Sequence, residues 1–322
     1  MMRHKILYLL LLLEISSAKA QELFPLSEPA SNAPKGVVGV KALTNSYQEF
    51  DALRNMVGLR LIYGLLPRLT LMATISASNH HDVDLPANLV SHTHLGNQTI
   101  YHVSPFQRGI PYPYIFNGVY LYAKFRFMSI DRFKSHLRGA VYGEWSNVNV
   151  AHDEAEANLM DDTKGYGTGL ILTYLKNHFA VSLNSGVVLP GSYAGNSTSY
   201  GLTLPTTIAY GRALNYNLSF GYLLFPKHYS SYQQINVNVY TEFVGKSYES
   251  ARVCQNGMEI PLETPLLKAG NYLDVHPGIQ FIFNSNTRVD LSVGLPLLRQ
   301  SYTHFYPFTY LSIQRYLYNE KK

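Results

Sequence analysis

Two polar segments of the sequence are rich in side chains that could bind a metal ion. Residues 79–115 contain five histidines, and residues 148–164 contain one histidine and five carboxylates. Imidazole and carboxylate groups together suit Zn²⁺ or Cu²⁺, and His92 and His94 stand two apart, so one extended stretch could present both to one ion. The candidate ligands are His80, His81, His92, His94, His102, His152, Asp153 and Glu154, with further carboxylates at Glu156, Asp161 and Asp162.

A simpler interpretation of the same residues is that they keep an exposed loop surface hydrated. A structural metal site usually needs a defined tetrahedral set, and no such spacing is visible here. The two segments can also meet only if the fold brings them together. We therefore treat divalent-metal binding as a hypothesis and expect no other cofactor.

The sequence lacks the motifs of the common hydrolases and nucleotide-binding enzymes. It contains no Gly-x-Ser-x-Gly elbow, no His-Glu-x-x-His zinc helix and no phosphate-binding loop. Adjacent acids such as Asp161-Asp162 are common in loops and do not by themselves indicate an acid–base pair. The sequence therefore predicts a protein that is not an enzyme.

Residues 1–20 have the three parts of a secretory signal peptide. Arg3 and Lys5 form a basic start, residues 6–13 are apolar, and Ala18-Lys19-Ala20 is a small-x-small cleavage site. The apolar run is too short to span a bilayer, so a retained transmembrane helix is the weaker alternative. The exported chain is predicted to begin at Gln21.

The composition favours a membrane protein built from strands. The 26 lysines and arginines nearly balance the 21 acids and form no cluster, so no nucleic-acid partner is expected. A single cysteine excludes an internal disulfide. The chain has 26 tyrosines and 15 phenylalanines beside one tryptophan, and tyrosine suits the boundary between membrane and water. No apolar run of 18 residues follows Ala20, which excludes a helical membrane protein.

Apolar and polar residues alternate along many segments, as they do in a strand that has one apolar and one polar face. In residues 68–78, for example, Leu71 and Ile75 share one face and Thr70 and Thr74 share the other. The predicted strands are residues 37–46, 55–65, 68–78, 116–128, 136–147, 165–175, 178–189, 208–224, 233–245, 269–284, 287–299 and 304–318.

Long and short connections alternate between these strands. Long loops are predicted at 47–54, 79–115, 148–164, 190–207 and 246–268, and shorter turns at 66–67, 129–135, 176–177, 225–232 and 285–286. A β-sandwich shares the period of two but has no reason to keep its long loops at one end. The pattern predicts an all-β fold, a transmembrane antiparallel up-and-down β-barrel of about 12 strands in the cell outer membrane, with long extracellular loops and short periplasmic turns. The count depends on reading 208–224 as one strand rather than as a hairpin at Arg212.

Four stretches resemble known outer-membrane proteins. LFPLSEPASNAPKG followed by GVVGV is similar to the start of a group of Bacteroidetes outer-membrane barrels, and AHDEAEANLMDDTKG and YNLSFGYLLFPKHY extend this resemblance along the chain. NYLDVHPGIQFIFNSNTRVDLSVGLPL resembles the penultimate hairpin of the phenol-degradation meta-pathway family of outer-membrane transporters. The resemblance implies a small barrel without an assigned substrate, and it supplies no catalytic residue.

Charged residues at the strand positions that alternate with the apolar, lipid-facing ones are predicted to line the lumen. They are Arg60, Arg68, Lys124, Arg126, Arg138, Glu144, Glu242, Asp274, Arg288 and Asp290. A pore lined in this way would select solutes by charge. The alternative is that these charges pair and fill a narrow barrel, because an unpaired buried charge is costly. Inward glycines, among them Gly64 and Gly221, leave room either for bulky neighbours or for a narrow passage.

The chain is predicted to have a short segment before the barrel, which spans residues 37–318. Residues 21–36 contain Pro25, Pro29 and Pro34, which disfavour regular strand pairing. We predict a periplasmic N-terminal segment or plug that reaches into the lumen, with Phe24 or Leu26 as its anchor. The alternative is a loose N-terminus.

Two functions are compatible with these predictions. The first is a narrow channel or facilitator for a small solute, with outer-membrane lipid and the solute as its partners. The second is a non-transporting surface-display barrel whose histidine-rich and acidic loops bind a divalent metal or a macromolecular ligand.

Overall fold

The computed structural model describes most of the chain after the predicted signal peptide. The described residues are 24–81, 85, 92–95, 98–101, 111–152, 154–199, 202–228, 231, 233–262, 265–300 and 307–318. The predicted signal peptide lies outside the described residues.

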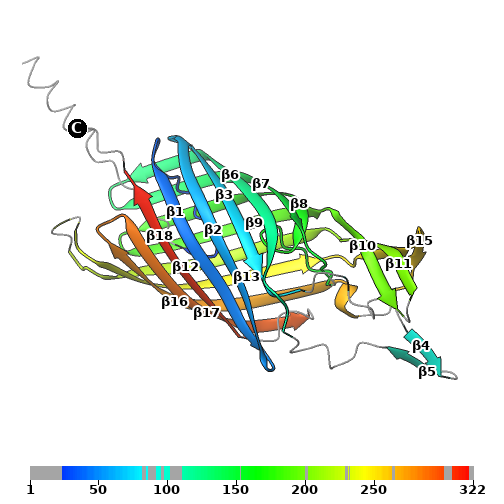
Figure 1. Ribbon diagram of the computed structural model, residues 1–322. Coiled ribbons are helices and arrows are strands. Elements are labelled where there is room, and N and C mark those ends of the chain that lie inside the picture. The colour runs from blue at the N-terminus through cyan, green and yellow to red at the C-terminus, as the bar shows by residue number, and fades with distance from the viewer. Residues whose placement is uncertain are drawn as a thin grey trace, which may run out of the picture.

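Twelve antiparallel strands form one closed barrel (Figure 1). Each strand pairs with the barrel strands before and after it, and β1 closes the barrel on β18, with Val38 opposite Leu317. Closure leaves the barrel with no unpaired edge. The all-β, up-and-down barrel of the sequence prediction is confirmed. Its strands are β1 (Val38–Glu49), β2 (Ala52–Leu66), β3 (Leu69–Ser78), β6 (Ile115–Arg132), β7 (Ser135–Asn149), β8 (Thr163–Lys176), β9 (Phe179–Pro190), β12 (Ala213–Phe225), β13 (Asn236–Tyr248), β16 (Gly270–Phe283), β17 (Thr287–Gln300) and β18 (Phe308–Leu317).

The outer and inner faces of the barrel wall differ in polarity. On β2, Leu59, Leu61 and Tyr63 are exposed on the outside, whereas Ile62 between them is buried inside. Exposed apolar side chains such as Leu183 of β9 recur around the barrel. A continuous apolar exterior is a liability in water, but it is the surface that lipid requires. Within the described residues, no helix is long and apolar enough to cross a membrane.

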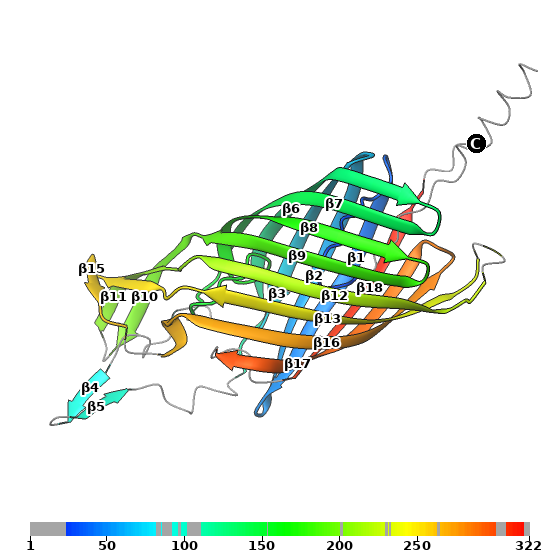
Figure 2. The ribbon, with the colours of Figure 1, turned by 180° about the vertical axis from the view of Figure 1, so that it is seen from behind.

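The additional strands gather beyond one end of the barrel (Figure 2). They belong to connections that were predicted as loops, so those connections are partly structured. Because long connections mark the extracellular side of such barrels, the opposite end, with its tight turns at 67–68 and 177–178, is the periplasmic end. One sheet contains β10 (Ser192–Ser199), β11 (Leu202–Ala209), β14 (Arg252–Gln255) and β15 (Met258–Ile260), and a hairpin contains β4 (His92–Leu95) and β5 (Gln98–Tyr101). A short 3₁₀ helix, η2 (Pro265–Leu267), precedes β16.

Two predicted boundaries are wrong. Residues 47–54 are not a long loop. β1 extends to Glu49 and β2 begins at Ala52, and these two residues pair with each other. An ion pair between Glu49 and Arg54 at 2.6 Å stabilises the tip of this hairpin. Residues 208–224 are not one strand. Ala209 pairs within the extracellular sheet, whereas Ala213 pairs within the barrel, so the chain must break between them.

Candidate functional site in the barrel lumen

Residues 24–37, which we call the plug segment, lie inside the barrel. Next to β1 the segment is fixed to β2, where Gly64 N–H donates to Val37 O at 3.0 Å. At its other end, Phe24 is 2% exposed and shares a buried apolar cluster with Tyr240 of β13. The segment therefore crosses the lumen from one wall to another.

Inward glycines provide the space that the plug segment occupies. A Cβ atom added to Gly64 would lie 2.0 Å from the carbonyl oxygen of Pro34, and one added to Gly221 would lie 3.1 Å from a ring carbon of Phe24. Both distances are shorter than an ordinary van der Waals contact. The room left by these glycines is thus filled by the chain's own N-terminal residues.

Glu242 of β13 is the main anchor for the start of the plug segment. Its carboxylate accepts the N–H of Leu26 at 3.0 Å and the N–H of Ser27 at 2.8 Å. The hydroxyl of Ser27 donates to the same carboxylate at 2.5 Å and lies 2.7 Å from the hydroxyl of Ser219 on β12. Glu242 is fully buried, so its charge depends on these donors.

Glu28 of the plug segment neutralises two cations of the wall. Its carboxylate lies 3.1 Å from Arg60 Nη1 and 3.2 Å from Lys124 Nζ. Lys124 Nζ also donates to the Pro29 carbonyl at 2.7 Å, and Lys41 Nζ donates to the Pro25 carbonyl at 3.2 Å. Lys41 and Lys124 are therefore bound to the plug segment rather than free to attract an anion.

A network of polar side chains fills the lumen beside the plug segment. Asp290 lies 3.1 Å from Arg288 Nε and accepts the Gln280 amide at 2.7 Å and the Ser312 hydroxyl at 2.8 Å. Arg288 also donates to Gln314 at 2.9 Å. Beside the plug segment the inward charges therefore pair with each other and are buried.

Between the plug segment and the extracellular loops lies a cavity of about 690 Å³. Its floor includes Pro25, Leu26 and Glu28 of the plug segment, and its lining continues up to Glu49 and Phe50 at the tip of the β1–β2 hairpin. The cavity is therefore an extracellular vestibule whose floor includes the plug segment.

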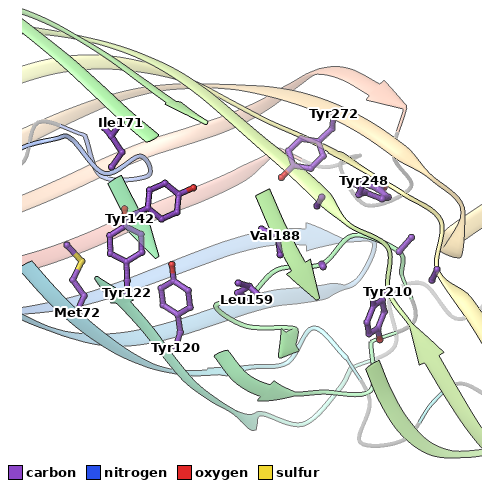
Figure 3. Packing of buried hydrophobic residues seen from close by; sticks show 14 of the residues in the cluster. Met72, Tyr120, Tyr122, Tyr142, Leu159, Ile171, Val188, Tyr210, Tyr248 and Tyr272 are labelled. Atoms are coloured by element: carbon purple, nitrogen blue, oxygen red, sulfur yellow. The ribbon is translucent and has the colours of Figure 1, made fainter. Parts of the chain in front are cut away.

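Stacked tyrosines form part of the vestibule wall (Figure 3). The ring centroids of Tyr122 and Tyr142 are 5.0 Å apart, and those of Tyr120 and Tyr122 are 6.4 Å apart. The hydroxyl of Tyr120 donates to the carboxylate of Glu144, and Arg60 also lines the cavity. The wall can thus contact both an apolar ring and a polar group of one solute.

Most residues predicted to line the lumen lie on the inner face of the wall. Arg68 is the exception, because it is exposed in the β2–β3 turn. Outside a strand, alternate positions no longer face the barrel interior. Arg54 and Lys246 were missed; both also line the vestibule. They lie just beyond the predicted strand ends, and extending the strands by one residue would have placed both inward. The residues found on the inner face are Arg60, Lys124, Arg126, Arg138, Glu144, Glu242, Asp274, Arg288 and Asp290.

Five residues form an imidazole–carboxylate cluster at the extracellular end of the vestibule. His80 and His81 lie two and three residues after the end of β3, whereas His152, Asp161 and Asp162 come from the connection between β7 and β8. That connection folds over the lumen. Its Met160 carbonyl accepts the Ser76 hydroxyl at 2.7 Å, and its Glu156 lies 2.8 Å from Lys246. The wall of the barrel thereby positions both halves of the cluster.

The cluster is compact enough to surround one ion. His81 Nε2 lies 3.2 Å from Asp162 Oδ1, and the ring centroids of His81 and His152 are 4.9 Å apart. One ligand atom from each of these three residues lies within 4.8 Å of the other two, and the same holds for His80, Asp161 and Asp162. Asp162 belongs to both sets.

Burial sets the protonation states in the cluster. It lowers the pKa of His80 and of His152 to about 4, so both imidazoles are neutral at pH 7. Burial and the charge of Asp162 raise the pKa of Asp161 well above its ordinary value. Burial acts on Asp162 too, but the hydrogen bond to His81 and the nearby imidazoles outweigh it and lower its pKa. Neutral imidazoles beside a carboxylate are the forms that bind metals.

The structure brings together only part of the predicted metal-ligand set. His80, His81 and His152 meet, and Glu154 Oε2 lies 4.0 Å from His152 Nε2. His92 and His94 are in β4, whose side chains are outside the described part of the chain, as are His102 and Asp153 entirely.

The fold has relatives among solved structures, although no protein-family model and no curated protein matches the chain. An outer-membrane channel from Pseudomonas putida F1 is 13% identical and gives a TM-score of 0.53 over 92% of this chain and 100% of that chain. The toluene transporter TodX of Pseudomonas putida is 13% identical over 87% of each chain. Its TM-score of 0.34 is too low to indicate the same fold. The two family resemblances stay predictions. The chain has the fold of an outer-membrane β-barrel, in agreement with its apolar exterior.

Proposed function

We propose that the chain is an outer-membrane facilitator for a small amphipathic solute, which enters the vestibule and passes when the plug segment moves. The observation that supports this proposal is the 690 Å³ vestibule, whose floor is made by the plug segment. A cavity of this size suits a small molecule. Its tyrosines can contact an apolar ring, while Arg60 and Glu144 can bind a polar group.

The way in which the plug segment is held is compatible with movement. Residues 24–36 form no strand. Individual hydrogen bonds to wall side chains such as Glu242 and Thr173 fix the segment, and at its end next to β1 the Gly36 N–H donates to the Gly64 carbonyl at 2.7 Å. Breaking these bonds leaves every strand-to-strand ladder of the barrel intact. The segment can therefore leave the lumen without opening the wall.

A surface-display barrel is the second candidate function. The paired charges around Asp290 and the plug segment occupy space inside the barrel, and a four-stranded sheet lies at the extracellular end. A barrel that stays sealed would have no transport function. Conductance separates the two candidates.

A reversible cross-link between the plug segment and the wall tests the proposed function. The hydroxyls of Ser27 and Ser219 are 2.7 Å apart, so a Ser27→Cys/Ser219→Cys variant should form a disulfide, with Cys254→Ser removing the native thiol. We expect the oxidised protein to show little conductance in planar bilayers and the reduced protein to conduct like wild type. The Ser27→Cys variant in the same background is the control, because it has no partner thiol.

Two results would contradict the proposal. If the oxidised and reduced proteins conduct equally, the solute route does not involve the plug segment. If neither the variants nor wild type conducts, the barrel is sealed and surface display is the better assignment.

A further inference from the structure

The imidazole–carboxylate cluster has the spacing of a metal site. Donor atoms of a tetrahedral zinc site are about 3.3 Å apart when the bonds to zinc are about 2.0 Å long. His81 Nε2 and Asp162 Oδ1 already lie 3.2 Å apart, and a His152 nitrogen lies within 4.8 Å of both. Small rotations of these side chains would bring three donors around one ion.

Several buried polar atoms in the cluster lack a hydrogen bond. Among the described residues, His152 Nδ1, His80 Nε2 and Asp161 Oδ1 have no partner. His152 is 1% exposed, and a buried nitrogen without a partner costs free energy. A bound cation would satisfy such atoms, whereas a hydrated loop surface would not bury them.

Tyr210 and Glu154 lie beside His152. The Tyr210 hydroxyl donates to the His152 carbonyl, and the two rings pack with centroids 5.4 Å apart. Glu154 Oε2 lies 4.0 Å from His152 Nε2, on the side where metal-binding histidines commonly have a carboxylate neighbour. This arrangement leaves Nδ1 for the ion.

We infer that the cluster binds one divalent transition-metal ion through His81, His152 and Asp162, with His80 or Asp161 as the fourth ligand. Imidazole nitrogen with carboxylate oxygen favours Zn²⁺, and also Cu²⁺ or Ni²⁺, over the oxygen-preferring Ca²⁺ and Mg²⁺. The ion would join the end of β3 to the connection between β7 and β8 at the extracellular end of the vestibule. This inference does not depend on transport.

Zinc titration of the purified, refolded full chain, without a polyhistidine tag and after chelator treatment, tests the inference. We expect one Zn²⁺ per chain by calorimetry. His81→Gln and Asp162→Asn should each weaken the affinity by more than about tenfold, since even a lost outer-shell partner costs 10–100-fold. Co²⁺ should give the visible absorption of a tetrahedral complex in wild type, and this absorption should be lost in both variants. Heat-modifiable gel mobility shows that each variant has folded.

Two controls separate this site from other histidines. His136→Ala removes the imidazole that lies 2.6 Å from Asp131 at the periplasmic end, and it should leave zinc binding unchanged. A triple change of His92, His94 and His102 to alanine should do the same. The inference is overturned if wild type binds no zinc, if the folded Asp162→Asn variant binds like wild type, or if binding disappears in the triple variant. None of these readouts measures conductance, so the proposed function can fail or succeed separately.

Discussion

Arginine at Leu183 is expected to lower the free energy of unfolding by roughly 2–4 kcal/mol, which is the cost of this side chain on the lipid face near the bilayer midplane. Leu183 is near the middle of β9 and is 50% exposed on the outside of the barrel. No partner for the guanidinium exists in the hydrocarbon, so the charge must distort the bilayer or reach toward an interface. Urea unfolding from lipid vesicles, together with heat-modifiable gel mobility, measures the change.

The neighbouring residue provides a matched control. Asn184 is next to Leu183 on the same strand but lines the vestibule, so arginine there should cost less than at Leu183. Thr70 and Thr74 also face inward but are unsuitable, because both are 1% exposed and hydrogen-bonded to the plug segment or to Arg60. If Leu183→Arg folds as well as wild type while Asn184→Arg does not, the faces are inverted and the chain is not a membrane barrel.

Alanine at Glu242 should release the plug segment. Two backbone N–H groups and one hydroxyl of the segment would lose a charged acceptor. Each hydrogen bond to a charged group contributes about 1.5–3 kcal/mol, so docking of the segment should weaken by at least about 3 kcal/mol. We expect a higher bilayer conductance than wild type and faster proteolysis within residues 24–37, while the barrel itself stays heat-modifiable.

A second variant, at the other end of the plug segment, tests whether a change in conductance comes from release of the segment or only from loss of the Glu242 carboxylate. The Cβ of Gly64→Ala would collide with the Pro34 carbonyl, so this variant should displace the segment by steric exclusion and raise the conductance as well. Glu259→Ala is the matched control, because this glutamate is exposed on β15 of the extracellular sheet, outside the barrel. If both plug variants conduct like wild type and resist proteolysis, the segment does not gate the lumen.

The sequence alone predicts the barrel because the membrane imposes a strict local rule. Every spanning strand must place apolar residues toward lipid at every second position, so the pattern along β2 or β17 can be read without knowing its neighbours. The alternation also identifies the inward residues, including Glu242 and Asp290. The alternation does not fix strand ends, because a strand that has left the membrane no longer needs an apolar residue at every second position. Arg54 and Lys246 were missed for that reason.

The plug segment and the cluster are products of tertiary structure. Three prolines show that residues 21–36 are not a strand, but only the closed barrel shows Glu28 between Arg60 and Lys124, and Pro34 against Gly64. His81 and Asp162 are far apart in the sequence, and no local sequence pattern indicates that they are neighbours in the fold. They meet because β3 ends beside the place where the β7–β8 connection folds over the lumen. Composition marks both loops as rich in metal-binding groups, but barrel closure decides which of those groups lie close to one another.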